Sequence, residues 1–257
     1  MLILITFQST HLTFNSTCTT SKKYNLKMFN SKRLRNKKRS GFTLIELLVV
    51  VSIIGILAGI MFNSGLFAFL KSAEAKKTKS IFRAWVTQIY QYKETYKHFP
   101  PVLLQGKEGE PLEIGPEYEE EHDRFLAALK GRVCKRSPKG AITWEPLDSF
   151  RDDNKRAREF HSFGEDEFGE DGYLADAWGG RKIFLVVDRD GDGLIELQST
   201  AFTELKDALL KEYDSEIIER AGDKLKFIHE KVGIYVLNDG GDSENVFSWN
   251  IKKYLEE

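Results

Sequence analysis

An apolar stretch from Phe42 to Phe62, broken by the single carboxylate of Glu46, is the strongest constraint on how this chain folds. A helix over these residues rises about 1.5 Å per residue and is roughly 30 Å long, which matches the hydrocarbon thickness of a bilayer. A basic run, KRLRNKKRS at residues 32–40, comes just before it. Because basic flanks stay on the cytoplasmic side, we expect residues 42–62 to cross a membrane once, with the rest of the chain outside.

The charge of the chain is distributed unevenly. Residues 1–41 hold nine of the 38 Lys and Arg residues and no acidic residue, which leaves 29 basic residues against all 39 Asp and Glu from Phe42 onward, a formal net charge of -10. An acidic surface disfavours phosphate contacts, so no nucleic-acid partner is expected. Cys18 and Cys134 are the two cysteines, and they indicate no disulfide framework. Met28 is an alternative start that would leave a compact basic leader.

The segment after the apolar stretch has the pattern of an amphipathic helix. Large apolar residues recur there at spacings of three and four, namely Ile81, Trp85, Ile89, Tyr92, Tyr96 and Phe99. Pro100 and Pro101 should end this helix, because proline lacks an amide donor and restricts the residue before it. We therefore expect one long helix, with a membrane-spanning half at residues 42–62 and an amphipathic half at residues 63–99.

Residues 100–257 are expected to form a globular domain. Residues 118–131 predict a short helix with Phe125, Leu126 and Leu129 inward. Residues 132–172 are rich in charge and turn formers and predict mostly loop, with one short strand at residues 159–163. Further strands are predicted at residues 181–187, 194–199, 224–229, 232–237 and 246–249, with a helical insertion at residues 203–221. The fold class is therefore α+β, a long N-terminal helix packed on a small antiparallel sheet.

Glu46 is unusual for its depth in the apolar stretch. A carboxylate within a membrane costs about 2.5 to 3.5 kcal/mol and usually has a partner. No Lys or Arg follows Glu46 before Lys71. A cut between Gly41 and Phe42 would create an α-amino group, and this cation could pair with the carboxylate.

Gly41 followed by FTLIELLVVVSIIGILA resembles the amino-terminal signature of type IV pilins and type II secretion pseudopilins. In that family a prepilin peptidase removes the leader and methylates the new first residue, and a glutamate guides docking into a helical filament. By resemblance, residues 1–41 are the leader, Gly41 and Phe42 are the cleavage and methylation site, and Glu46 serves assembly. The implied partners are the prepilin peptidase, an inner-membrane assembly platform, membrane lipid, and other pilin-like subunits in a homo- or hetero-polymer.

The function that this resemblance implies is that of a structural subunit of a type II secretion pseudopilus, anchored once in the bacterial inner membrane with its globular domain in the periplasm. One alternative is a surface type IV pilin for adhesion, motility or DNA uptake. Another is a membrane-anchored calcium-binding protein that does not polymerise. Residues 102–172 match no part of the family pattern.

A first candidate metal site lies in VVDRDGDGLIEL. Oxygen ligands recur there at alternate positions, as carboxylates of Asp188, Asp190, Asp192 and Glu196 and as the carbonyl of Leu194, and hard oxygen ligands suit calcium. An EF-hand is not expected, because Ser199 stands where its bidentate glutamate would be and strands flank the loop. The alternative is a solvated hairpin turn, in which Asp and Gly satisfy positive φ angles.

The resemblance supports the calcium interpretation, because many pseudopilins hold a structural calcium ion in a carboxy-terminal loop. YLADAWGGRKIFLVVD is similar to the segment that leads into a strand in those proteins, through Asp176, Trp178 and Gly179. A second candidate loop has looser spacing and contains Asp239, Asp242 and Asn245. Either loop, both or neither can hold the metal, and its role would be to stabilise the folded domain.

No enzyme is expected. The five histidines lack a metal-ligand spacing and a neighbouring serine or cysteine nucleophile motif; they are His11, His98, His122, His161 and His229. The chain also has no phosphate-binding Gly-rich loop, CxxC pair or HExxH sequence.

Overall fold

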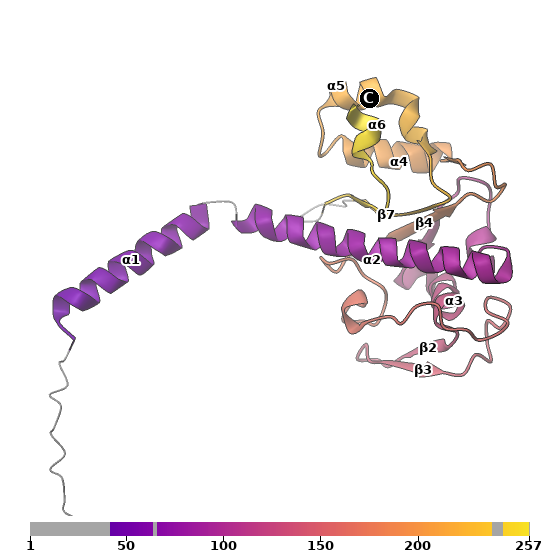
Figure 1. Cartoon of the computed structure of the whole chain (residues 1–257), viewed down its shortest axis with the longest axis horizontal. Helices are drawn as coiled ribbons and strands as arrows, with labels where there is room; N and C mark the ends of the chain where they lie inside the picture. Colours follow the sequence, from indigo (N-terminus) through magenta and orange to yellow (C-terminus); the bar gives the residue numbers. More distant parts are fainter. Residues whose placement is uncertain (1–41, 64–65, 238–243, 257) are drawn as a thin grey trace, which may run out of the picture. The chain divides into compact units, whose positions relative to one another are not determined.

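The computed structural model describes residues 42–63, 66–237 and 244–256 (Figure 1). The chain divides into two compact units, Met1–Ile53 and Ile54–Glu257. The first unit contains the start of helix α1, Leu44–Asn63, and the second contains the globular domain.

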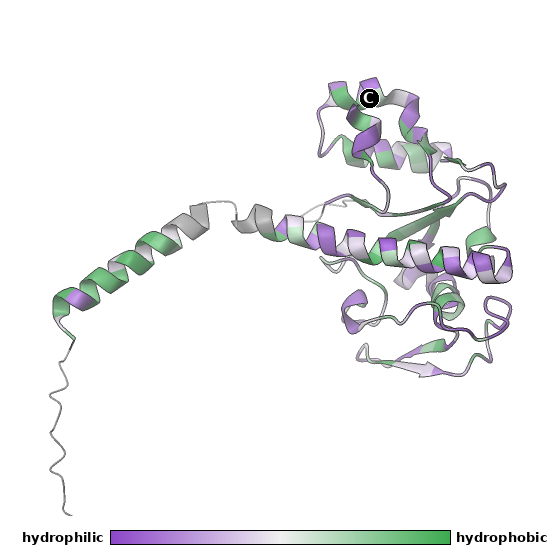
Figure 2. Cartoon of the chain, viewed as in Figure 1, coloured by the Kyte–Doolittle hydropathy of each residue, from purple (hydrophilic) through white to green (hydrophobic). Residues whose placement is uncertain are grey.

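Helix α1 carries exposed apolar side chains on every side. Figure 2 shows it in the hydrophobic colour along most of its length, while hydrophobic and hydrophilic residues alternate along helix α2, Leu66–Tyr96. Within the described ranges, no helix is both long enough and apolar enough to cross a membrane. The expected span at residues 42–62 is therefore helical from Leu44 but is not identified as a spanning helix.

Helix α2 has the predicted apolar stripe. Its buried apolar residues, each no more than 1% exposed, are Phe82, Trp85, Ile89 and Tyr92. Ile81 and Tyr96 of the predicted stripe are only half-buried. The predicted continuity of one helix over residues 42–99 depends on residues 64–65, which lie outside the described residues.

The end of α2 comes earlier than predicted, because the helix stops at Tyr96 and not at the two prolines. Lys97 has a left-handed φ of 67°, which breaks the helical path. This turn directs Phe99 into the core, where it is 3% exposed and lies 3.8 Å from Lys93 Nζ, measured to the ring centroid. The helix therefore ends at the turn that buries Phe99, and it does not extend to Pro100 and Pro101.

The central sheet has four antiparallel strands in the order β1-β4-β7-β8. Their bounds are Leu112–Ile114 for β1, Ile183–Val187 for β4, Val232–Val236 for β7 and Val246–Phe247 for β8. Leu185 lies opposite Leu112 on one side and Ile234 on the other. The sheet confirms the predicted α+β class, and β4, β7 and β8 confirm three of the predicted strands.

Both faces of this sheet are buried, which explains why β4 and β7 read as continuous apolar runs. Leu185 and Ile234 belong to the cluster that includes Trp85 of α2. Val186 and Tyr235 point to the opposite face, where they join residues of three C-terminal helices. These helices are α4, Ser199–Leu209, α5, Ser215–Ala221, and α6, Lys252–Glu256. The sheet is therefore the middle layer between α2 and the C-terminal helices.

The rest of the domain differs from the sequence-based expectations in several places. Residues 132–172 contain a hairpin, β2 and β3, whose bounds are Val133–Arg136 and Ile142–Glu145, and residues 159–163 form no strand. Strands β5, Ile195–Glu196, and β6, Phe227–Ile228, pair only with each other, apart from the central sheet. The predicted helix at 118–131 is α3, Glu119–Lys130. The 3-10 helices are η1, Pro101–Leu104, η2, Pro116–Tyr118, η3, Glu165–Glu167, and η4, Gly222–Lys226.

Asn154 secures the loop between β3 and η3. Its side chain is fully buried and donates from Nδ2 to the carbonyls of Ala128, at 2.9 Å, and Arg158, at 2.7 Å. Its Oδ1 accepts from the hydroxyl of Tyr96 at 2.7 Å and from the amide of Arg158 at 3.0 Å. This single amide group thus ties the loop to both α2 and α3.

Candidate functional site

The start of α1 is a capping box built from Thr43 and Glu46. The Thr43 amide and hydroxyl donate to Glu46 Oε2 at 2.8 and 2.9 Å, and the Glu46 amide donates to Thr43 Oγ1 at 3.3 Å. These bonds satisfy backbone donors that the first turn of a helix leaves without partners. Phe42 is exposed just before this turn, and Gly41 lies outside the described residues.

The capping box changes the interpretation of Glu46. The sequence suggested that this carboxylate needs a cation, whereas the structure supplies two uncharged donors from Thr43. Both donors use Oε2, and within the described residues no hydrogen bond uses Oε1. The T-x-x-E spacing that produces this arrangement is readable in the sequence as a capping box. The role of Glu46 in assembly stays a prediction.

The first acidic loop, between β4 and β5, gathers three of the five predicted metal ligands. Carboxylate oxygens of Asp188, Asp190 and Asp192 all lie within 4.8 Å of one another, with Asp188 buried and the other two exposed. The amides of Gly191 and Gly193 donate to Asp188 Oδ1 and Oδ2 at 2.6 and 3.0 Å. Local bonds therefore orient the buried carboxylate in the loop.

The two exposed aspartates also form local turns. Asp190 Oδ1 accepts the amide of Asp192 at 3.2 Å, and Asp192 Oδ1 accepts the amide of Leu194 at 2.8 Å. Glu196 does not join the cluster, because it lies on β5 and forms an ion pair with Lys226. The structure thus brings together the three aspartates and directs Glu196 elsewhere.

Glu108 is a neighbour of this loop that the sequence analysis missed. Its Oε2 accepts the amide of Arg189 at 3.1 Å, and that amide lies between Asp188 and Asp190. Its Oε1 is buried and has no hydrogen-bond partner within the described residues. Burial, with a smaller contribution from Asp190 and Asp188, raises the pKa of the Glu108 carboxyl. No motif could have indicated this residue, since it comes from a loop about 80 residues earlier.

Residues 103–110 are held against the acidic loop by more than Glu108. Arg189 donates from Nε to the Leu103 carbonyl at 3.1 Å and from an Nη to the Glu110 carbonyl at 3.2 Å. Gly109 has a φ of +69° and packs so closely that a Cβ there would lie 1.6 Å from the carbonyl oxygen of Glu196. Residues 103–110 are therefore held in place against one side of the acidic loop.

The segment that resembles the family's strand approach forms a turn before β4. Asp176 Oδ1 accepts the amides of Trp178 and Gly180 at 2.9 and 2.7 Å. The amide of Ala177 donates to Thr78 Oγ1 on α2 at 3.0 Å. Asp176 thus shapes a turn that fixes the start of β4 against the helix.

The second acidic loop is only partly described. Asp239 and Asp242 lie outside the described residues. The amide of Asn245 donates to Glu212 Oε1 at 2.6 Å, and its Nδ2 donates to the Ala208 carbonyl at 3.0 Å. These bonds anchor the end of the loop to α4 and its C-terminal extension, and metal binding there stays a prediction.

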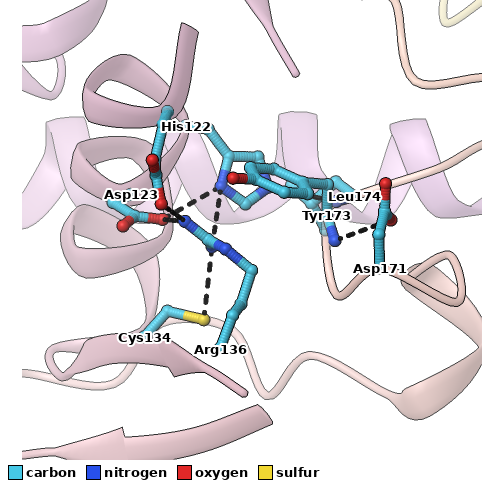
Figure 3. A network of polar contacts seen from close by, with 8 residues as sticks. His122, Asp123, Cys134, Arg136, Asp171, Tyr173 and Leu174 are labelled. Carbon is cyan, nitrogen blue, oxygen red and sulfur yellow. Dashed lines mark hydrogen bonds and ion pairs between the residues drawn. The ribbon is translucent and has the colours of Figure 1, made fainter. Parts of the chain in front are cut away.

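A buried network lies around His122, at the contact between α3 and β2 (Figure 3). The Leu174 amide donates to His122 Nε2 at 3.0 Å, and Nδ1 lies 3.1 Å from Asp123 Oδ1. Since Nε2 accepts a hydrogen bond, the proton of the neutral ring belongs on Nδ1, which donates to Asp123. Burial holds the pKa of His122 below its usual value.

Arg136 organises the charges of this network. Its guanidinium forms ion pairs with Asp123 at 2.6 Å and Glu119 at 3.1 Å and lies 4.2 Å from the ring centroid of Tyr173. It also donates to Cys134 Sγ at 3.6 Å. Burial raises the pKa of the Cys134 thiol to about 11, so the thiol is uncharged at neutral pH. The network therefore joins α3, β2 and the loop at Tyr173. Its buried hydrogen bonds and ion pairs stabilise the contact between these elements.

Comparison with known proteins identifies the N-terminal segment. A family model for the prokaryotic N-terminal methylation motif matches residues 36–62, which include Gly41, Phe42 and Glu46. The motif supports a type IV pilin-like protein, a structural and not an enzymatic class, in secretion or a pilus. It implies processing by a prepilin peptidase, polymerisation with pilin subunits, and a membrane-anchored, extracytoplasmic location. A search of curated proteins and a search of solved structures each found no match.

Proposed function

We propose that this protein is a structural subunit of a type II secretion pseudopilus or a closely related filament. It is anchored in the bacterial inner membrane by residues 42–62, cut after Gly41, methylated on Phe42 and added to a periplasmic polymer. The observation that carries this proposal is the methylation motif at residues 36–62, with Glu46 placed one turn after Phe42.

The capping box supports a specific role for Glu46 in assembly. Thr43 holds Oε2 and thereby fixes the carboxylate at the first turn of α1, beside the residue that becomes the chain terminus after cleavage. An ammonium group of a neighbouring subunit can then meet Oε1 without breaking the bonds to Thr43. In an apolar surrounding such a pair is strong once formed, and an unpaired carboxylate is costly.

The globular domain suits a mechanical subunit. Its sheet is buried on both faces, and α2 contributes Trp85 and Ile89 to the core. A force applied along α2 is therefore transmitted to a packed core and not to a loosely attached domain.

Mass spectrometry of the protein from its native cells tests the processing step. A chain that begins at methylated Phe42 is expected. An intact leader, with Phe42 never exposed as a terminus, would overturn the proposal.

Two matched variants test the assembly step. Glu46→Gln keeps an acceptor for Thr43 and removes the charge, whereas Thr43→Val removes the side-chain cap and keeps the charge. We expect both variants to be cut after Gly41, and only Glu46→Gln to be lost from filaments. Normal filaments with Glu46→Gln, and their loss with Thr43→Val, would assign Glu46 to helix capping alone.

The proposal includes a structural calcium ion at Asp188, Asp190 and Asp192. Calcium binds oxygen at about 2.3 to 2.6 Å, so two ligands on opposite sides of the ion are about 5 Å apart. The separations of no more than 4.8 Å among these carboxylates fit that requirement. Bound calcium would offset the repulsion among three adjacent carboxylates and so stabilise the connection from β4 to β5.

A further inference from the structure

A groove on the C-terminal side of the domain has a basic rim and an aromatic floor. It has a volume of about 590 Å³ and is formed by η4, β6, α6 and the end of the acidic loop. Its lining residues are Leu194, Lys224, Phe227, His229, Lys253 and Tyr254. Lys224, His229 and Lys253 are exposed, whereas the other three side chains are half-buried.

The floor of this groove is preorganised. The rings of His229 and Tyr254 stack with centroids 5.9 Å apart and an angle of 22° between their planes. The His229 amide also donates to the Tyr254 hydroxyl at 3.0 Å. Within the described part of the chain, no ion pair uses Lys224 or Lys253. The groove therefore offers an aromatic surface and two cations to a ligand that is aromatic and acidic.

The chain carries a segment with that chemistry at residues 116–121, where η2 leads into α3. Tyr118 is 42% exposed, which is high for a large aromatic side chain, and exposed Glu117 and Glu120 flank it. Glu119 pairs with Arg136, whereas none of the ion pairs in the described ranges uses Glu117 or Glu120. An exposed aromatic residue among carboxylates is complementary to a groove of aromatic rings and lysines.

The groove and the acidic segment cannot meet within one chain. In Figure 1, α6 and α3 lie on opposite sides of α2. A contact between them must therefore join two copies, with a different patch used on each copy. Such a head-to-tail contact repeats from copy to copy, and it produces an open helical polymer when the rotation between copies does not close a ring.

We propose that residues 116–121 of one subunit dock into the Lys224–Lys253 groove of the next subunit, with Tyr118 against Phe227 and Tyr254. This inference rests on the proposed function, because it concerns contacts in the polymer. The chain from Phe42 has a formal net charge of -10, so two copies repel each other at most orientations. The basic groove attracts the acidic segment of a second copy although the two chains repel each other overall. This local attraction gives the globular domains a preferred register.

Charge reversal in the full chain, expressed in cells that assemble the filament, tests the docking. Lys253→Glu and Glu120→Lys should each lower the amount of subunit in sheared filaments by about tenfold, and the double variant should restore it. Lys155→Glu, which reverses an exposed lysine outside the groove, is the matched control and should assemble normally. Mass spectrometry of each variant shows whether the chain has been cut after Gly41.

Disulfide cross-linking gives a second readout. Cells that produce a Tyr118→Cys chain together with a Lys253→Cys chain should form a mixed cross-linked dimer, and neither chain alone should do so. Cys134 is buried and should not contribute. Normal filaments from Lys253→Glu without a mixed dimer would overturn the docking and leave the proposed function standing. Absence of filaments and of processed chain for the unaltered protein would overturn both.

Discussion

Replacing Asp190 with Asn should leave the calcium-free protein intact and abolish its stabilisation by calcium. Asp190 is exposed, and its Oδ1 accepts the amide of Asp192 at 3.2 Å. The side-chain oxygen of Asn can accept the same bond, so the turn is retained. The substitution also removes one of three carboxylates within 4.8 Å of one another, which relieves repulsion in the absence of metal.

The expected size of the effect follows from linkage. Calcium at about 100 times its dissociation constant stabilises the folded protein by about 2.7 kcal/mol. For a domain of this size, 1 kcal/mol changes the Tm by about 2 to 4 °C, so calcium should raise the Tm by about 5 to 10 °C. In Asp190→Asn this shift should be lost, while the Tm in chelator stays within about 2 °C of the parent value.

Asp188→Asn should behave differently. Both oxygens of Asp188 accept backbone amides, and the Asn side chain can accept only one of these bonds. We expect a loss of about 1 to 3 kcal/mol even in chelator, because the Nδ2 group of a buried Asn side chain would face a backbone amide instead of an acceptor. The two variants thus separate the structural role of the loop from metal binding.

The assay is thermal unfolding of the full chain in detergent, followed by tryptophan fluorescence, with calcium and with chelator. Asp152→Asn, at an exposed position away from the cluster, is the matched control and should keep the calcium shift. A parent protein that is insensitive to chelator would establish the bare turn in place of the metal site. A full calcium shift in Asp190→Asn would exclude that residue as a ligand.

Three further outcomes are expected. Burial lowers the pKa of His122, so the unfolded chain takes up the proton first as the pH falls. Stability measured by urea unfolding should therefore be constant between about pH 6.5 and 8 and fall below about pH 6.5, and His122→Gln should reduce this slope. Asn154→Ala removes the four hydrogen bonds of a buried side chain and should cost at least about 2 kcal/mol in the same assay, and a loss below about 0.5 kcal/mol would contradict the anchoring role. Gly109→Ala and Gly191→Ala both place a Cβ at positive φ, but only the Cβ at residue 109 would meet a backbone oxygen. Gly191→Ala should therefore lower the free energy of unfolding by about 1 kcal/mol, and Gly109→Ala should lower it clearly more. Equal losses would contradict the packing argument.

The features that the sequence predicted correctly are those that depend on local pattern. The stripe of α2 appears at helical spacing, and Trp85, Ile89 and Tyr92 are buried as expected. Strands β4 and β7 are apolar runs long enough to be recognised. The methylation motif is a contiguous string, so its match needs no tertiary information.

Other features depended on partners far away in the chain. Strand β1 has only three residues, and it is a strand because Leu112 lies opposite Leu185. The hairpin of β2 and β3 was missed for a similar reason, since four-residue strands among charged residues have little periodicity. In the predicted strand at residues 159–163, the backbone forms no ladder.

The candidate site shows the same division. The sequence alone was sufficient to indicate the cleavage and methylation segment, the amphipathic helix and the alternate aspartates, because each is encoded in one contiguous stretch of residues. Tertiary structure decided that Glu196 pairs with Lys226 and leaves the cluster, and that Glu108 enters its neighbourhood. The physical reason is that a carboxylate can accept hydrogen bonds from any donor that the fold brings close to it. Spacing along the chain predicts only the donors that are close in sequence.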